Sequence, residues 1–155
     1  MKVLMVCLGN ICRSPLAQGI LEARATEAGL NWEVDSAGTL RYHVNEPPFV
    51  LSQQVAKENG IDISKQRCRV FLPEDMHNFD RIYVMDGDNY AAVKKISGTH
   101  FQEKKVMRLL DVLYPGEERN VPDPYNGTKK DFEAVFQLID SACRKIVDNY
   151  GRSAG

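Results

Sequence analysis

The 155-residue chain is poor in several features that would point to particular classes of protein. Its four cysteines, at positions 7, 12, 68 and 143, are thinly spread, which argues against a secreted scaffold held by disulfides. No CxxC pair and no pair of histidines has the spacing of a zinc site, so we expect neither a metal nor another cofactor. These absences favour a reduced, cytoplasmic protein.

The chain also lacks an excess of charge and any long apolar run. Lysine and arginine number 20 against 21 aspartates and glutamates, and a net charge of −1 gives no reason to expect nucleic acid or an anionic membrane as partner. No apolar stretch reaches the length of a bilayer span, and the short run at residues 3–6 is typical of a buried strand rather than a signal peptide. With 43% hydrophobic residues, we expect one domain over residues 1–155, with 151–155 as a frayed tail.

Apolar runs alternate with helical patterns along the chain. We predict strands at residues 3–6, 32–36, 80–85 and 105–109, and helices at 15–28, 49–59, 87–96 and 131–150, with Ser14 capping the first helix. This alternation predicts an α/β domain with a four-stranded parallel sheet. Cys7, Ser36 and Asp86 each follow a predicted strand, so we expect them at the same end of the sheet, where ligands bind.

The sequence CLGNICRSP, which follows the first apolar run, contains the residue types expected of an oxyanion-binding site. Backbone amides in a tight loop at a helix N-terminus can hold phosphate oxygens, and Gly9 permits a close backbone approach. Arg13 supplies a planar fork for two oxygens, and helix N-termini with nearby cations favour the thiolate form of a cysteine. The loop therefore indicates phosphate-ester chemistry through Cys7, assisted by a hydroxyl donated from Ser14 and a loop conformation held by Asn10.

Each of these residues also has a plainer interpretation. The C-x5-R spacing is weak by itself, because the chain holds ten arginines. Cys7 could be a small buried apolar residue, and Arg13 or Ser14 could simply cap a helix. The position of the whole string, between a buried strand and a helix, favours the phosphate site.

Thiol chemistry on a phosphate ester also requires an acid for the leaving group, which is typically worth ~10²–10⁴ in rate. The sequence VPDPY at 121–125 holds Asp123 between two prolines, so its carboxyl has a defined direction. The same carboxylate could later activate water. Asp-Pro is also an ordinary turn starter, which is the alternative role for Asp123.

Taken in order, several motifs resemble those of the low-molecular-weight protein tyrosine phosphatase family. They are VCLGNICRSP at 6–15, DSAGT at 35–39, NEPP at 45–48, GIDIS at 60–64, MD at 85–86 and DPY at 123–125. The resemblance spans essentially the whole chain and implies a flavodoxin-like, three-layer α/β/α fold. It also implies hydrolysis of phosphotyrosine in protein substrates, and of small aryl phosphates, with inorganic phosphate as product. The implied phosphate-binding loop consists of Leu8, Gly9, Asn10, Ile11, Cys12, Arg13 and Ser14.

The resemblance assigns roles residue by residue. Cys7 would be the nucleophile, Arg13 the phosphate-binding group and Asp123 the general acid and then base. Asn10, Ser14 and Ser36 match positions that support the loop, and Asp86 matches a residue that orients the arginine. Cys12 would form a reversible disulfide with Cys7 and protect it from overoxidation, and its alternative role is that of a small packing residue.

Substrate choice would be set by the pocket walls. Tyr42 and Tyr125 match aromatic wall positions of the family and, with Ile11, would select phosphotyrosine, since phosphoserine is too short to reach the nucleophile. The chain departs from the family at Asn126, Phe49 and Gln66. The second tyrosine often found at position 126 is absent, Phe49 adds an apolar group near the rim, and Gln66 removes a histidine support.

The sequence alone leaves other functions open. A phosphoarginine phosphatase on the same fold would carry threonine where this chain has Ile11. An arsenate reductase needs a further cysteine pair, whereas Cys68 and Cys143 are far apart in the sequence. A non-catalytic phosphate-binding module would not need Cys7 together with Asp123. We expect a monomer or weak dimer, and we expect the three histidines to be solvated loop or surface residues, namely His43, His77 and His100.

Overall fold

Four parallel strands form a single sheet at the centre of the computed structural model, which describes residues 1–154 and the side chains of residues 1–151. The strands are β1 (Lys2–Cys7), β2 (Glu33–Gly38), β3 (Arg81–Val84) and β4 (Val106–Arg108), in the order β2-β1-β3-β4. In register, Cys7 pairs with Gly38 and Met5 with Tyr83. The predicted fold class is confirmed.

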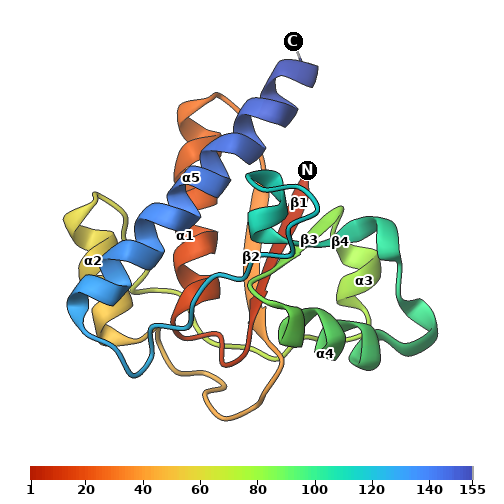
Figure 1. Cartoon of the computed structure of the whole chain (residues 1–155), viewed down its shortest axis with the longest axis horizontal. Helices are drawn as coiled ribbons and strands as arrows, with labels where there is room; N and C mark the ends of the chain where they lie inside the picture. Colours follow the sequence, from red (N-terminus) through yellow and green to blue (C-terminus); the bar gives the residue numbers. More distant parts are fainter. Residues whose placement is uncertain (155) are drawn as a thin grey trace.

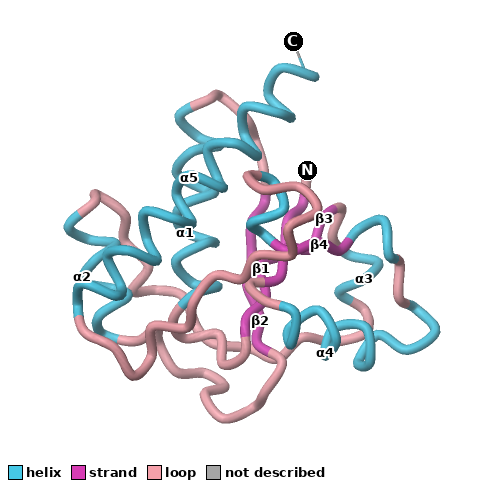
Figure 2. Tube along the Cα trace, viewed as in Figure 1, coloured by secondary structure: helices cyan, strands magenta, loops and turns pink. Residues whose placement is uncertain are grey.

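Helices cover both faces of the sheet and complete three layers (Figures 1 and 2). One face carries α1 (Arg13–Glu27), α2 (Val50–Glu58) and α5 (Lys129–Ala154), and the other carries α3 (Asp75–Asn78) and α4 (Gly87–Ser97). Short 3₁₀ turns, η1 (Gly98–His100), η2 (Glu103–Lys105) and η3 (Leu109–Val112), flank β4. Within residues 1–154, no helix combines the length and apolarity needed to cross a bilayer.

The alternation of side chains along β1 explains why the hydrophobic core has two layers, one on each face of the sheet. Val3, Met5 and Cys7 belong to the cluster beneath α1 and α5, whereas Leu4 and Val6 belong to the cluster beneath α3 and α4. Successive strand side chains point to opposite faces, so a continuous apolar run is what a strand buried on both sides requires. Cys7 therefore ends β1 facing the α1 side.

The two longest helices differ from the sequence prediction at their ends. Cys12, not Ser14, is the N-cap residue of α1, without a side-chain cap bond, and Pro15 is the third helical residue. Helix α5 continues to Ala154, beyond the end predicted at Tyr150. Residue 155, the last of the predicted tail, lies outside the described residues. Tyr150 packs edge-on against Trp32 and accepts a hydrogen bond from Arg81, and these contacts anchor the last turns of the helix.

The strand order reverses direction between β1 and β3. In open parallel sheets such a switch point leaves a crevice at the carboxyl ends of the strands, where ligands bind. The segment after β1, residues 8–12, and the start of α4 after β3 both lie at this edge. Ser36 lies within β2 rather than after it, but near the same end.

Candidate active site

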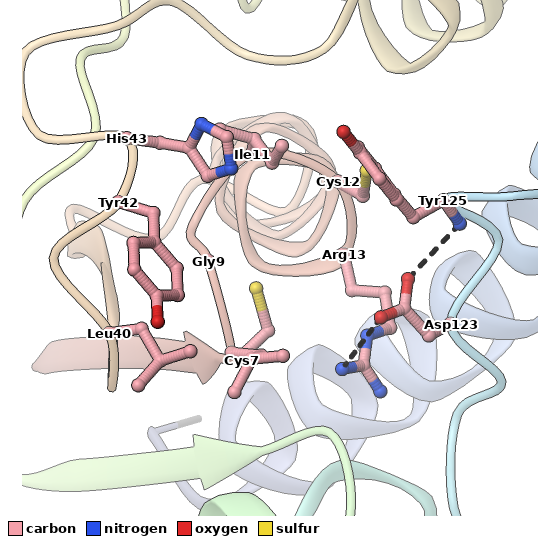
Figure 3. A pocket seen from close by; sticks show the side chains of 11 residues that line it. Cys7, Gly9, Ile11, Cys12, Arg13, Leu40, Tyr42, His43, Asp123 and Tyr125 are labelled. Atoms are coloured by element: carbon pink, nitrogen blue, oxygen red, sulfur yellow. Dashed lines mark hydrogen bonds and ion pairs between the residues drawn. The ribbon is translucent and has the colours of Figure 1, made fainter.

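The loop of residues 7–14 joins β1 to α1 and curves around a pocket whose floor is the Cys7 side chain (Figure 3). Asn10 adopts a left-handed backbone, with φ of 57°. Thr39 and Leu40 donate backbone hydrogen bonds to the Leu8 carbonyl. In a planar trans peptide the C=O and the next N–H point in opposite directions, so the Gly9 N–H faces the concave side of the loop.

Gly38 lets the end of β2 approach this loop closely. A Cβ atom at position 38 would lie 2.9 Å from the Leu8 carbonyl oxygen and 3.0 Å from the Asn10 nitrogen. Real side chains do not tolerate such contacts with backbone atoms. Only glycine fits at position 38 without moving the loop.

The Asn10 side chain uses three hydrogen bonds to fix the loop. Its amide nitrogen donates to Ser14 Oγ at 2.8 Å and to Ser36 Oγ at 3.0 Å, and its oxygen accepts from the Arg69 N–H at 3.0 Å. Ser36 in turn donates to Gln18 Oε1 at 2.7 Å. The structure therefore brings together the three predicted support residues and adds Gln18 and Arg69, which the sequence did not single out.

Ser14 lies beside the Cys7 sulfur, with Oγ 3.0 Å from Sγ, and both residues are buried. Because Asn10 already donates to Ser14 Oγ, the hydroxyl proton is available for the sulfur. A hydroxyl donated to a thiolate stabilises its negative charge. This contact explains why Ser14 does not cap α1.

Arg13 is 3% exposed, and one side of its guanidinium is fully engaged. Nη1 donates to Asp86 Oδ2 at 2.8 Å and to the Val121 carbonyl at 2.9 Å, while Nη2 lies 3.7 Å from Asp123 Oδ2. The other Asp86 oxygen accepts from the Asn89 N–H and caps α4. Arg13 is thus held in a fixed orientation, with the rest of its fork directed to the pocket.

Asp123 reaches the same pocket from the loop before α5. Its Oδ1 accepts a hydrogen bond from the Tyr125 N–H at 3.1 Å, and its side chain is 45% exposed. One oxygen is thereby fixed by the backbone, while the other lies near Arg13. Segments more than 100 residues apart in sequence converge on one site (Figure 3).

The pocket encloses about 160 Å³ and has aromatic walls. Tyr42 and Tyr125 stand on opposite sides, with the Cys7 sulfur between them (Figure 3). An apolar cavity of about 150 Å³ is large enough to bind benzene, so the volume suits one aryl ring. Ile11, Leu8 and the other lining residues are mostly apolar, including Leu40, which the sequence did not single out.

Phe49 supports one of these walls. Its ring packs against Tyr125 at 5.4 Å between centroids and stacks on Phe132 of α5 at 5.6 Å. The Phe49 N–H also donates to the Ile11 carbonyl at 2.8 Å. The departure at position 49 therefore continues the apolar wall into the core.

His43 lies in a loop, as predicted, but its side chain is only partly exposed. It lines the pocket beside Gly9 and Ile11, and its Nδ1 lies 2.6 Å from Glu46 Oε2. His77 and His100, by contrast, are exposed as predicted and contact each other. No periodic pattern in residues 39–48 indicates which side chains turn inward, so the sequence could not place His43.

All four cysteines are free and buried. Burial, with the nearby negative charges of Cys7 and Asp123, raises the pKa of the Cys12 thiol to about 12. Cys143 of α5 lies in the core and Cys68 contacts the loop at Asn10, so the two do not form a pair. Across the described residues, no cluster of three or more histidine, cysteine or acidic side chains is arranged to hold a metal ion.

Comparison with known proteins identifies the family. The model of the low molecular weight phosphotyrosine protein phosphatases matches residues 2–154. The chain belongs to this family. The human low molecular weight phosphotyrosine protein phosphatase is 36% identical over 149 residues, covering 95% of this chain and 94% of the human protein.

Solved structures agree with this membership of the phosphatase family. YfkJ of Bacillus subtilis, named a low molecular weight protein-tyrosine-phosphatase, has 33% identity and a TM-score of 0.91, covering 100% of this chain and 97% of its own. The arginine phosphatase YwlE has a TM-score of 0.88 at 23% identity, covering 96% of this chain and 95% of its own, and this likeness shows the fold alone. The expected family and its protein-tyrosine phosphatase class are confirmed.

Proposed function

We propose that this phosphatase hydrolyses phosphotyrosine in proteins through a covalent phosphocysteine on Cys7. The observation that carries the proposal is one aryl-sized pocket in which the Cys7 sulfur, Arg13 and Asp123 meet. A thiol, a fixed cation and a carboxylic acid are the groups that a two-step phosphoryl transfer requires.

In the first step, Cys7 Sγ attacks phosphorus in line with the ester oxygen, forming the S–P bond as the P–O bond breaks. Loop amides and the free side of the Arg13 fork bind the equatorial oxygens, whose charge is greatest in the transition state. Protonated Asp123 gives its proton to the departing phenolate. The backbone N–H of Tyr125 favours this role of Asp123, because it holds one carboxyl oxygen in place while the other oxygen is directed towards the pocket.

In the second step, the Asp123 carboxylate takes a proton from water, and the water oxygen attacks phosphorus. The S–P bond breaks and inorganic phosphate forms. The Cys7 thiolate is now the leaving group, and the Ser14 hydroxyl 3.0 Å away stabilises its charge. The same contact thus serves the sulfur as attacker and as leaving group.

Tyr42, Tyr125 and Ile11 favour phosphotyrosine over phosphoarginine. Two aromatic side walls complement a phenyl ring, and an ester on a short serine side chain would not reach the floor of the pocket. Ile11 offers a branched apolar group and no hydrogen bond to a guanidinium. Phosphoarginine is the second candidate substrate, because an arginine phosphatase shares the fold.

Direct comparison of phosphotyrosine and phosphoarginine peptides on one preparation tests the substrate. We expect a clear preference for phosphotyrosine and no turnover by Cys7→Ser. Ile11→Thr should move the preference towards phosphoarginine, whereas Ile11→Val, whose side chain has the shape of threonine without the hydroxyl, should not. Turnover by Cys7→Ser would exclude the nucleophile assignment, and equal shifts in both Ile11 variants would exclude a polar role at this position.

We further propose that Cys12 protects Cys7 during oxidative stress. A peroxide would convert the Cys7 thiolate to sulfenic acid, and attack by Cys12 sulfur would form the disulfide and release water. The negative charge of Cys7 helps to raise the pKa of Cys12, so oxidation of Cys7 to a neutral group favours the Cys12 thiolate. After peroxide treatment, Cys12→Ser should lose activity that dithiothreitol does not restore, whereas the parent should recover.

The remaining expectations concern where and in what form the enzyme acts. We infer a cytoplasmic protein that works as a monomer or weak dimer on phosphoprotein substrates, and four free thiols suit a reducing compartment. Light scattering across a concentration series tests the assembly state. A stable higher oligomer would contradict this expectation.

A further inference from the structure

Cys68 lies directly beneath the phosphate-binding loop, although its position in the sequence gives it no assigned role. It is 4% exposed, and its Sγ–H donates to the Asn10 carbonyl at 2.7 Å. Its backbone N–H donates to the Glu46 carbonyl at 2.8 Å, and its own carbonyl accepts from the Asn45 N–H at 2.9 Å. Residue 68 thus connects the phosphate-binding loop with the segment that follows Tyr42 and His43.

The Asn10 carbonyl is an important atom of the loop because of what lies across its peptide plane. In a planar trans peptide the Ile11 N–H points opposite to the Asn10 C=O. With the carbonyl held from below by Cys68, the Ile11 N–H is directed to the concave side, where phosphate oxygens would bind. Asn10 has φ of 57°, in the left-handed region that residues other than glycine seldom adopt. Such a backbone conformation needs support from its surroundings.

Two neighbouring carbonyls of the loop are held in the same way. The Ile11 carbonyl accepts from the Phe49 N–H at 2.8 Å, and the Cys12 carbonyl accepts from Ser52 Oγ at 3.3 Å. Three successive peptide units are therefore fixed on their outer side. The first of the three depends on a cysteine thiol.

We propose that Cys68 is a positioning residue whose thiol fixes the Asn10 carbonyl and thereby aims the Ile11 N–H at the phosphoryl group. This inference rests on the proposed phosphate site at Cys7. Cys68 itself is not among the residues that line the pocket. Its effect is transmitted through one peptide plane.

The protonation state of Cys68 agrees with a donor role. Burial raises the pKa of its thiol to about 11, and the negative charges of Cys7 and Glu46 add to this. Cys68 therefore keeps its proton at neutral pH and donates it continuously. A serine hydroxyl could replace this donor, since the short S···O separation leaves an oxygen on the shorter C–O bond within reach, whereas alanine could not.

Cys143 provides a matched control within the same chain. It is also a buried thiol that donates to a backbone carbonyl, that of Ala17, at 3.9 Å. It lies in α5 and belongs to the core rather than to the loop. Loss of a buried thiol at either site removes packing, but only loss at position 68 should disturb anion binding.

The experiment compares the full-length parent with Cys68→Ala, Cys68→Ser and Cys143→Ala under reducing conditions. Inhibition by inorganic phosphate is measured against p-nitrophenyl phosphate hydrolysis, and iodoacetate alkylation of Cys7 is followed across pH by mass spectrometry. For Cys68→Ala we expect the phosphate inhibition constant to rise roughly fivefold, the worth of one hydrogen bond. The alkylation profile should move to higher pH, because a misdirected N–H stabilises the thiolate less.

Cys68→Ser should recover most of both properties, and Cys143→Ala should match the parent in both while melting at a lower temperature. Unchanged phosphate inhibition in Cys68→Ala would overturn the proposal. So would equal losses in Cys68→Ala and Cys68→Ser, or a similar loss in Cys143→Ala. Failure of the phosphatase function itself is a separate result, because the parent would then neither hydrolyse the ester nor be inhibited by phosphate.

Discussion

Replacing Phe49 by alanine should separate the stability of the fold from recognition of the aryl group. The Phe49 ring is half-buried between Phe132 at 5.6 Å and Tyr125 at 5.4 Å. Truncation of a fully buried phenylalanine costs about 3–5 kcal/mol, so a half-buried ring should cost roughly 2 kcal/mol. For a chain of this size, that loss lowers the melting temperature by about 4–8 °C.

The effect on substrate should be smaller and specific to the aromatic ring. Without Phe49 behind it, Tyr125 must be ordered when substrate binds, at about 0.5–1.5 kcal/mol. This corresponds to a KM for a phosphotyrosine peptide that rises about two- to tenfold. Inhibition by inorganic phosphate should not change, because the Phe49 N–H that holds the Ile11 carbonyl remains in the alanine variant.

Thermal melting and steady-state kinetics on Phe49→Ala and Phe49→Leu provide the measurements. Leucine keeps much of the apolar volume and should regain most of the melting temperature. An increase in the phosphate inhibition constant that equals the increase in KM would contradict this prediction. That result would mean that Phe49 acts on the loop and not on the Tyr125 wall.

Three further predictions concern the acid, the loop and the buried thiols. Asp123→Asn should lower kcat by about 10²–10³ for phenyl phosphate but much less for p-nitrophenyl phosphate, whose leaving group needs no proton; equal losses would argue against proton donation. Gly38→Ala should raise the phosphate inhibition constant at least tenfold in the same kinetic assay, because its Cβ would lie within 3.0 Å of loop backbone. The part of the stability that depends on Cys12 and Cys68 should be constant below about pH 9 and be lost as the pH rises towards 11–12, because unfolded thiols ionise near 9 whereas the pKa values of these two buried thiols are raised to about 12 and about 11. Urea unfolding across pH checks this, and a slope that Cys68→Ala does not reduce would contradict it.

The sequence predicted most of the architecture because its signals there are local. The run at residues 3–6 predicted β1, and two glycines of left-handed backbone follow the ends of α1 and α2, namely Gly29 with φ of 73° and Gly60 with φ of 78°. The proposed nucleophile and phosphate-binding group could also be predicted from the sequence, since Cys7 and Arg13 lie within one short motif. Strand alternation then predicted the sheet edge at which this motif would lie.

Interactions between distant segments account for the differences. Serine is a common helix-capping residue, but the Ser14 hydroxyl is engaged by the Cys7 sulfur and the Asn10 side chain. Helix α1 therefore begins before Ser14 and earlier than predicted. Helix α5 extends beyond its predicted end because Trp32 and Arg81 contact its Tyr150. The four-residue helix α3 is too short to show a periodic pattern.

Cys68 and His43 were missed for a related reason. The contact of Cys68 with Asn10 joins residues 58 positions apart, and no local spacing indicates it. His43 belongs to an irregular segment in which burial follows the path of the loop. Residues that act by holding the backbone of a neighbour are the hardest to predict from a sequence, because the contact depends on where the fold places that backbone.

The two oxygens of Asp86 carry a consequence for how this enzyme can be altered. One oxygen caps α4 through the Asn89 N–H, and the other holds Arg13. Asparagine is as good a helix cap as aspartate, but it lacks the negative charge that orients a guanidinium. Asp86→Asn should therefore survive a screen for folding and fail a screen for turnover. Selection for thermal stability alone would let this position drift and would return well-folded, inactive enzymes.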